Sequence, residues 1–272
     1  MRHFILFVSL LFCISMVSAQ DDDFSDDKGS SNGLNDVHLF QGFFQDAPVS
    51  ESIFAEGGIV YDSYDGWSQF QFGVQGGMPI NEQIEVGVGL GFCSWSPDEG
   101  DGQSGLKDLY VSGKYNVLPG VTNVSAGGYV TLPIGEEKIG AKKLNFGAFG
   151  AVRHPVNDGL VITGVFGIDF MEIEKWTGGS FNWQTGEYTE PKKKTEYENS
   201  ILIGGGAIYA VNEALNAVAE LNIRTEGDFM QLTAGGDYAL GTGSRVRGAV
   251  GLGLDDGAPD LSLLASFLHF FN

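Results

Sequence analysis

Charged side chains at alternating positions of apolar segments are the residues of this sequence that could bind an ion or a polar solute. They are Glu85, Asp108, Lys114, Arg153, Asp169, Glu220, Arg224, Asp237, Arg245 and Arg247. Tyr110 and Tyr129 share the polar faces of two of these segments. Basic side chains hold anions through charge-assisted hydrogen bonds. Arg245 and Arg247 alternate on one segment and Arg224 ends another, so the three form a candidate anion-favouring patch.

Catalysis finds little support in the residue pattern. A serine hydrolase needs a histidine beside its serine and a polar group that orients the imidazole. The histidines are His3, His38, His154 and His269, and none is expected to stand in such a set. The glycines of 87–91 and 204–206 lack the strand–turn–helix context of a phosphate-binding loop. The acidic stretches 98–101 and 255–260 lack the ligand spacing of an EF-hand. We predict no catalytic residue, no metal site and no cofactor.

The excess of acidic residues argues against a nucleic-acid partner. The chain has 35 acidic and 15 basic residues and a net charge of −20. Nucleic-acid binding needs clustered basic residues, and the cluster that exists, Lys192–Lys194, is expected in a loop. Nucleic acid is therefore not a predicted partner. With 41 glycines but only 8 prolines, the composition argues against a disordered chain.

The N-terminus predicts export. Arg2 and His3 precede an apolar run from Phe4 to Val17, and Ala19 stands before the expected cleavage point. This order is typical of a secretory signal peptide, predicted here as residues 1–19. Once it is removed, Cys93 is the only cysteine, so no intramolecular disulfide can form.

Residues 20–50 form the next segment. It begins with an acidic stretch that is expected to be disordered. From Asp36 to Ser50 it contains several apolar residues without a clear period. This part could be a periplasmic segment, a plug inside a barrel or an additional strand.

Residues 51–272 repeat a unit of one strand and one connection. Twelve strands are expected, at Ser52–Tyr61, Trp67–Met78, Gln83–Trp95, Leu106–Val117, Asn123–Leu132, Lys143–His154, Leu160–Glu174, Ser200–Val211, Leu215–Arg224, Phe229–Leu240, Arg245–Leu254 and Asp260–Phe271. Many alternate between apolar and polar residues, so each has one face of each kind. In a soluble sandwich the apolar face is the core, whereas in an outer-membrane barrel it meets lipid.

The connections and the aromatic residues decide between these two folds. Short turns follow the even-numbered strands, and most of the longer, polar connections follow the odd-numbered ones, as in outer-membrane barrels. The tryptophans fall near the long connections, and other aromatics fall near the short turns. The predicted membrane-interface residues are Trp67, Trp95, Trp176, Tyr115, Tyr209, Tyr238 and Phe271. We predict an all-β fold, a closed antiparallel up-and-down transmembrane barrel of about twelve strands.

In such a barrel the polar faces turn inward. The charged residues named first, together with Tyr110 and Tyr129, then become lumen-lining candidates. They either neutralise one another and fill the interior or line a solute path. Barrels of this size lie between small ones filled by side chains and large ones with an open channel, so a narrow or plugged pore is expected.

Two resemblances add to this interpretation. The last strand, DLSLLASFLHFFN, is similar to the aromatic C-terminal signal of bacterial outer-membrane proteins, although Asn272 follows the final Phe271. The segments GLKDLYVSGKYNVL, GGYVTLPIGEEKIG, FGAFGAV and the closing strands resemble the transporter-like outer-membrane family named for the meta-pathway of phenol degradation. The second resemblance implies a barrel that takes up small compounds, hydrophobic or aromatic ones among them, and supplies no catalytic residues.

The expected function is a passive pore or transporter for small solutes in the outer membrane of a Gram-negative-type bacterium. The expected partners are outer-membrane lipid, a small solute and, through the C-terminal strand, the barrel-assembly machinery. Two alternatives stay open. One is a structural or adhesive barrel that acts through its long loops, and the other is a soluble exported β-sandwich that binds a ligand.

Overall fold

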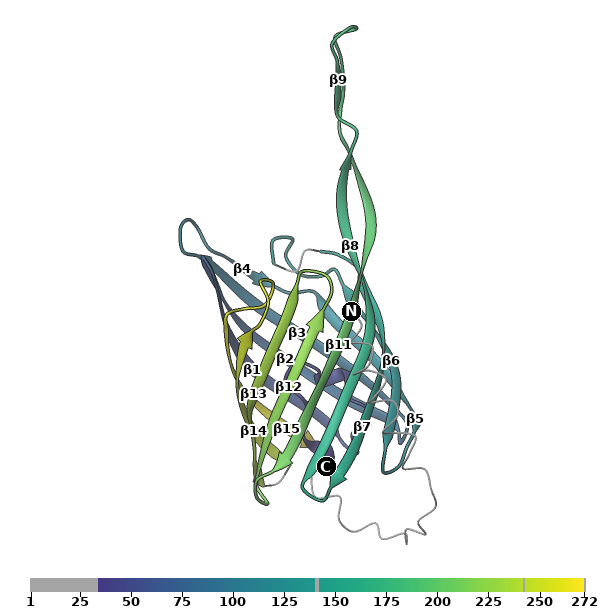
Figure 1. Ribbon diagram of the computed structural model, residues 1–272, viewed down its shortest axis with the longest axis vertical. Coiled ribbons are helices and arrows are strands. Elements are labelled where there is room, and N and C mark those ends of the chain that lie inside the picture. The colour runs from purple at the N-terminus through teal and green to yellow at the C-terminus, as the bar shows by residue number, and fades with distance from the viewer. Residues whose placement is uncertain (1–33, 140–141, 242, 272) are drawn as a thin grey trace, which may run out of the picture. The chain divides into compact units, whose positions relative to one another are not determined.

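The computed structural model describes residues 34–139, 142–241 and 243–271. The predicted signal peptide and the acidic stretch up to residue 33 lie outside the described residues. Twelve strands form the wall of a barrel (Figure 1). They are β1 (Ile53–Tyr64), β2 (Trp67–Asn81), β3 (Ile84–Pro97), β5 (Leu109–Leu118), β6 (Asn123–Leu132), β7 (Asn145–Asn157), β8 (Leu160–Thr177), β11 (Lys192–Ala210), β12 (Leu215–Arg224), β13 (Phe229–Gly241), β14 (Ser244–Gly253) and β15 (Leu261–Phe271).

The barrel is closed and antiparallel throughout. Each wall strand pairs with the next one along the chain, and β1 pairs with β15 from Ile53↔Phe271 to Ser63↔Leu261. Closure leaves the wall itself without a free sheet edge. The predicted antiparallel barrel of twelve strands is confirmed, and a β-sandwich is excluded. Within the described residues, no helix has the length and apolar character needed to cross a membrane.

The two rims of the barrel differ. Short turns after β2, β5, β7, β11 and β13 form one rim, called here the short-turn rim. The other connections form the long-connection rim, which includes the short strand β4 (Gln103–Leu106) folded back on β3. The C-terminal strand ends at the short-turn rim, opposite the projecting hairpin in Figure 1.

That hairpin corrects the prediction of a long loop over 175–199. Strands β8 and β11 stay paired far beyond the wall, as far as Thr177↔Lys192, and β9 (Ser180–Asn182) and β10 (Glu187–Thr189) continue the ribbon. We call residues 175–198 the arm. Cross-strand ion pairs hold it, such as Lys193–Glu174 at 2.5 Å and Lys175–Glu198 at 3.1 Å. Since neither face of the arm is buried, the sequence shows no apolar alternation there.

The wall has an apolar outer face and a mixed inner face. Large apolar side chains project outward from many of the wall strands and are exposed. They include Phe72, Val88, Phe166, Leu221, Val250 and Phe267. Inward positions carry the charged and amide side chains, as the alternation predicted, but also some apolar ones between β7 and β12. Monomeric soluble proteins rarely expose a continuous apolar surface of this extent.

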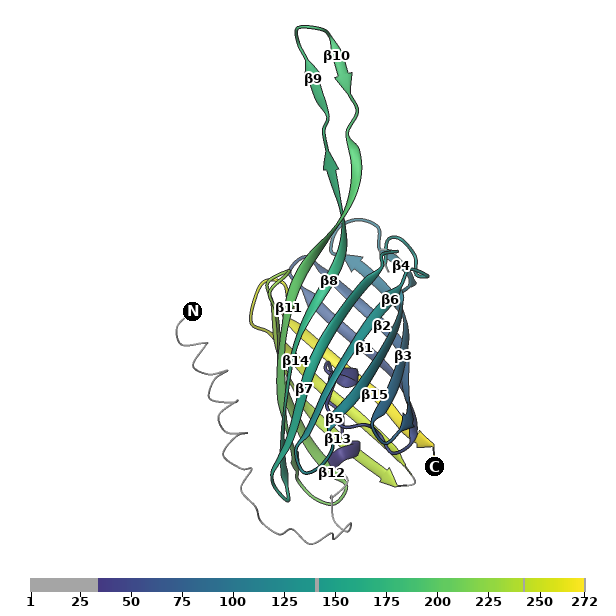
Figure 2. The same ribbon diagram turned by 90° about the vertical axis from the view of Figure 1, so that its right-hand side faces the viewer.

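Residues 34–50, called here the inner segment, lie inside the barrel (Figure 2). The segment contains two short 3-10 turns, η1 (Leu34–Asp36) and η2 (Phe43–Gln45), and is otherwise irregular. Most of its described side chains are buried, Val37 and Ala47 completely. Most of its polar partners lie on the parts of the wall strands next to the short-turn rim, for example Glu85 on β3 and Arg153 on β7, whereas Gln41 reaches Gln231 near the other end of β13. The inner segment therefore fills the half of the lumen next to that rim.

Candidate functional site

The inner segment has almost no secondary structure to satisfy its own backbone. The backbone bonds within it include Val37 N–Leu34 O at 3.1 Å and Gln45 N–Gly42 O at 3.0 Å. Buried peptide groups without a partner are costly, so other groups must bond to the remaining ones. The charged side chains of the lumen do so.

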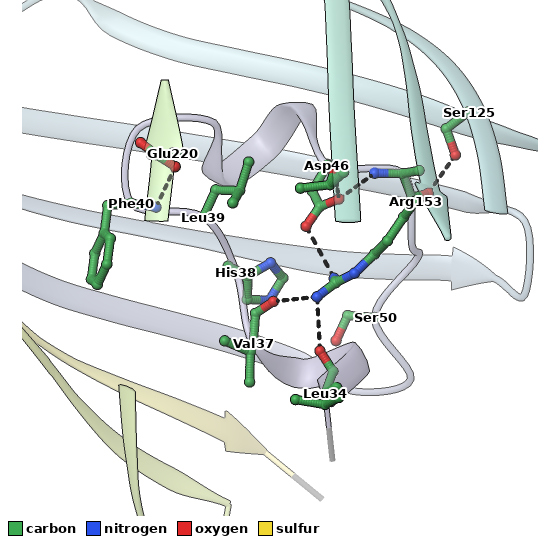
Figure 3. A network of polar contacts seen from close by, with 12 residues as sticks. Leu34, Val37, His38, Leu39, Phe40, Asp46, Ser50, Ser125, Arg153 and Glu220 are labelled. Carbon is green, nitrogen blue, oxygen red and sulfur yellow. Dashed lines mark hydrogen bonds and ion pairs between the residues drawn. The ribbon is translucent and has the colours of Figure 1, made fainter. Parts of the chain in front are cut away.

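Arg153 on β7 binds both ends of the inner segment (Figure 3). Its Nη2 donates to the carbonyl oxygens of Leu34 at 2.8 Å and Val37 at 2.9 Å. Its Nη1 donates to the Asp46 carboxylate at 3.0 Å. Both side chains of this ion pair are almost completely buried. Asp46 also accepts a hydrogen bond from Thr163 at 3.0 Å. One guanidinium thus ties the start of the segment to its second turn.

Arg247 on β14 holds the middle of the segment. Its Nη2 donates to the carbonyl oxygens of His38 at 2.6 Å and Leu39 at 3.0 Å. The same guanidinium pairs with Glu56 at 2.6 Å and with Asp237 at 3.2 Å. It also lies 4.8 Å from the ring centroid of Phe40. Both Nη groups are hydrogen-bonded and the side chain is almost completely buried, so this cation is not available to a solute.

Carboxylates bind the backbone N–H groups. Glu220 on β12 accepts from Phe40 N at 3.0 Å and from Gln41 N at 2.6 Å (Figure 3). Glu85 on β3 accepts from Ser50 N at 2.8 Å and pairs with Lys114 at 3.0 Å.

Donors on the wall complete the set. Lys114 donates to the carbonyl of Asp46 at 3.1 Å, and Ser125 donates to the carbonyl of Ala47. Together with the two arginines and the carboxylates, these side chains supply the hydrogen bonds that neighbouring strands would give to the backbone of a regular segment.

Apolar contacts add to these bonds. Three clusters join the inner segment to the wall, and each contains residues from both. In the first, Val37 and Leu39 pack with Ile208 and Val218. In the second, Phe43 and Phe44 pack with Phe54, Leu268 and Phe270, and in the third Ala47 packs with Phe149 and Leu202. Burial of this much apolar surface makes the inner segment part of the core of the protein.

Cavities remain in the other half of the lumen, and two of them are lined by residues that the structure describes. The larger, about 370 Å³, has the side chains of Phe40, Phe43 and Phe44 on one side. It extends to Lys107, Asp108 and Arg224, which lie where wall strands meet the long-connection rim. The second, about 300 Å³, shares Phe40 and Gln41 with the first and reaches Tyr64, Phe229 and Pro259 at the same rim.

The predicted lumen residues thus fall into two groups. Glu85, Lys114, Arg153, Glu220 and Arg247 bind the inner segment directly. Asp237 pairs with Arg245 at 2.5 Å as well as with Arg247. With both of these arginines paired, the anion-favouring patch expected of them does not form, and Arg224 lies toward the opposite rim, 4.0 Å from Asp169.

The remaining candidates lie near the larger cavity. Tyr110 and Tyr129 stack at 5.1 Å, and Tyr110 also stacks on Phe44 at 5.4 Å. Asp108 accepts a hydrogen bond from Gly135 N at 2.9 Å. Sequence reasoning missed Glu56, Asp62 and Lys107. The glycines of β1 hide the alternation that would have placed the first two inward. Lys107 was expected within the strand Leu106–Val117, on its apolar face, whereas in the structure it lies between β4 and β5.

The aromatic residues predicted at the membrane interfaces lie in three places: the short-turn rim, the long-connection rim and the arm. Tyr115, Tyr209, Tyr238 and Phe271 are exposed on the outer face near the short-turn rim. Trp67 and Trp95 lie at the long-connection rim with centroids 6.1 Å apart, and Trp67 stacks on Tyr64 at 3.8 Å. Trp176 is on the arm, beyond Phe170, the last β8 residue that pairs with β7. It therefore does not belong to the rim of the barrel.

One pair of residues contradicts the expectation that no serine stands beside a histidine. Ser244 Oγ and His269 Nδ1 are 2.9 Å apart on neighbouring strands at the short-turn rim. His154 bonds Thr122 Oγ1 at 2.7 Å in a similar position. Within the described residues, no third polar side chain hydrogen-bonds to the His269 ring. The pair thus lacks the group that would orient the imidazole for nucleophilic catalysis.

Comparison with known proteins finds likeness in structure alone. No family model matches this chain, and no curated protein matches it either. An outer-membrane channel from Pseudomonas putida F1 superposes with a TM-score of 0.61 at 10% identity, over 83% of this chain and 98% of that one.

Two further structures have lower scores. The KdgM porin in complex with disordered oligogalacturonate gives 0.53 at 10% identity, over 80% and 99% of the two chains. The translocator domain of autotransporter NalP from Neisseria meningitidis gives 0.54 at 15% identity, over 84% and 92%. At these identities the likeness shows a shared barrel fold.

Proposed function

We propose that this protein is an outer-membrane channel for small solutes, closed at its short-turn side by the inner segment. The observation that carries the proposal is a closed wall with an apolar outer face around a polar lumen that holds cavities. A barrel satisfies its own backbone hydrogen bonds, which a membrane demands, and the outward side chains suit lipid. The solved structures of similar fold include a channel and a porin, which supports the same role here.

The orientation follows from the rims. Short turns of outer-membrane barrels face the periplasm, and long loops face outward. The inner segment would then close the periplasmic side, and both cavities would open toward the exterior. The predicted signal peptide and the aromatic end of β15, which would be read by the barrel-assembly machinery, fit this location. Membership in the family named for phenol degradation is part of this proposal and rests on the motifs given above.

Conductance in planar bilayers tests the proposal. The wild-type protein is compared with a variant in which residues 34–50 are replaced by a Gly/Ser sequence of equal length. Such a sequence cannot form the three apolar clusters or the Asp46–Arg153 ion pair. We expect small, infrequent openings for the wild type and a larger steady conductance for the variant.

Folding of the two proteins is the control. Both should migrate as heat-modifiable bands and require detergent. A variant that folds but conducts no more than the wild type would overturn the plug, and a wild type that folds in water without detergent would overturn the membrane barrel.

The arm supports a second candidate function, attachment to an external surface. It projects beyond the wall and carries Trp176, Trp183 and Tyr188, all more than half exposed. Exposed aromatic residues on a projecting element are typical of recognition sites. If the arm serves attachment, replacing it with a short turn should abolish surface binding by whole cells and leave channel conductance unchanged.

A further inference from the structure

The larger cavity contains a basic side chain that the barrel positions but does not neutralise. Three cations line this cavity: Lys107, Arg224 and Arg247. Arg247 is fully paired with Glu56 and Asp237, and Arg224 has Asp169 at 4.0 Å. Within the described part of the chain, Lys107 has no carboxylate in ion-pair distance.

Lys107 is held in place from two directions. Its backbone N–H donates to the carbonyl of Gly91 at 2.7 Å, which fixes the residue against β3. Its side chain crosses the same glycine, since a Cβ built on Gly91 would lie 3.4 Å from Lys107 Cδ. The ammonium then reaches Gln71 Oε1 on β2 at 2.7 Å. The glycine leaves room for the lysine side chain to lie along the wall.

The amide of Gln71 is itself oriented. Its Nε2 donates to Asp62 at 3.0 Å, and that carboxylate also accepts from Gln69 at 2.8 Å and from Ser262 at 2.5 Å. Because Asp62 can only accept, the amide must turn its NH₂ toward Asp62 and its oxygen toward Lys107. An ammonium has three donors, and Gln71 uses one of them. The other two remain for a partner, and the oxygens of a carboxylate can accept both.

Aromatic side chains of the inner segment also line the cavity. Phe43 and Phe44 of the inner segment lie there, with Tyr110 stacked on Phe44 at 5.4 Å. Binding pockets of roughly 300 to 1,000 Å³ hold small organic molecules, and this cavity of about 370 Å³ lies at the lower end of that range. A compact ligand with an apolar ring at one end and an anionic group at the other would use both surfaces.

We propose that this cavity binds a small organic acid, with the carboxylate on Lys107 and a flat apolar body against Phe43, Phe44 and Tyr110. This inference rests on the proposed channel function, because it names the class of solute that the channel would select. It locates anion recognition at Lys107 rather than at the arginines near the inner segment, which are occupied by other groups.

Calorimetric titration of the detergent-folded, full-length protein at low salt tests the site. Sodium benzoate is the probe, and benzyl alcohol is its neutral counterpart of nearly the same shape. We expect benzoate to bind and benzyl alcohol to bind about tenfold more weakly, because a charge-assisted hydrogen bond is worth about one such factor. Added salt should weaken benzoate binding alone.

Variants of one lysine sharpen the result. Lys107→Gln should weaken benzoate binding about tenfold and leave benzyl alcohol unchanged, and Lys107→Arg should retain most of the affinity. Lys194→Gln is the matched control, because it removes the same charge from the exposed arm. Equal affinity of the wild type for the two probes, without salt dependence, would overturn the proposal even if no variant folds. So would an unchanged benzoate affinity in a folded Lys107→Gln protein.

The outcome is separable from that of the channel proposal. Titration in detergent needs no passage across a membrane, whereas liposome flux of benzoate does. Benzoate binding that depends on Lys107, without flux in any variant, would sustain the site and overturn the channel. Benzoate flux that exceeds the flux into protein-free liposomes and is unchanged in Lys107→Gln would sustain the channel and overturn the site.

Discussion

The two halves of the lumen use their charged residues in opposite ways. Next to the short-turn rim, Arg153, Arg247 and Glu220 are buried and bonded to the main chain of the inner segment. Toward the long-connection rim, Lys107 and Arg224 line a cavity and stay accessible. The same alternating pattern of residues produces both halves. Whether a charged side chain is bonded to the protein or accessible to a solute depends on where the inner segment, residues 34–50, lies.

The difference has an energetic basis. In the filled half each buried charge meets several fixed partners, which is the condition under which a buried ion is tolerated. In the hollow half water can solvate the charges, so they need no such partners. A solute that enters from the long-connection rim would therefore meet the solvated charges first and the inner segment last.

Removing one cation from each half of the lumen should give the largest difference in the stability of the folded barrel. Arg153→Ala leaves the buried Asp46 carboxylate without a cation and removes the guanidinium donor from the carbonyls of Leu34 and Val37. Breaking a buried ion pair costs about 3 to 5 kcal/mol, and we expect a loss of that order in the stability of the folded barrel, with increased conductance. Unfolding by guanidinium, followed by intrinsic fluorescence, measures the first effect.

Arg224→Ala is the matched substitution in the hollow half. The side chain is half exposed, and its carboxylate partner is 4.0 Å away. Exposed pairs contribute about 0 to 1 kcal/mol, so stability should change by no more than that. Equal losses for the two variants would show that the two halves do not differ as described.

Two glycines on the paired strands β3 and β5, one facing the lumen and one facing outward, allow a comparison with a smaller expected effect on stability. A Cβ on Gly87, which faces the inner segment, would lie 2.6 Å from the Phe44 ring and from Ser112 Oγ. A Cβ on Gly113, on the outer face one strand away, meets nothing closer than 4.0 Å. Overpacking costs about 1 to 3 kcal/mol, so Gly87→Ala should lower the unfolding free energy by that amount. Gly113→Ala should leave it nearly unchanged.

Much of the wall could be predicted from the sequence, because alternation is a local signal. The bounds of β6 and β12 agree with the predicted strands Asn123–Leu132 and Leu215–Arg224. Closure into a barrel followed from the spacing of strands and the asymmetry of the connections. The ends of β8 and β11 were missed because the arm is solvated on both faces and carries no apolar face to mark it.

The filled half could not be predicted in the same way. The inner segment has no period, and its bonds go to residues far away in the chain, such as Leu34 to Arg153. One local signal did exist. Around Val161 and Val165, apolar residues stand at inward as well as outward positions of β8, with Thr163 as the polar exception, and such a pattern is typical of a strand buried on both sides. The inward residues Val161 and Val165 pack in the clusters of the inner segment, so this stretch marked where the lumen is filled.

The smallest effect on stability is expected for the arm, because it lies outside both halves of the lumen. Hydrogen bonds from Lys193 to Glu174 and from Lys194 to Glu196 lower the pKa of both glutamates below the ordinary range. A carboxylate with a lowered pKa in the folded state stabilises that state fully above the pKa of the unfolded chain. The stabilisation is lost as the pH falls through the folded pKa.

Acidification should therefore loosen the arm while the wall stays closed. Protection factors from amide hydrogen exchange, which correct for the slower intrinsic exchange in acid, are compared at neutral pH and at a pH below the ordinary glutamate pKa. They should fall in residues 174–177 and 192–196 alone. The variant Glu174→Gln should exchange faster already at neutral pH and respond less to acid, since its side chain no longer titrates. Exchange that accelerates equally in β12 and β14 would mean that the arm and the wall open as one unit, and the ion pairs would then have no separate role.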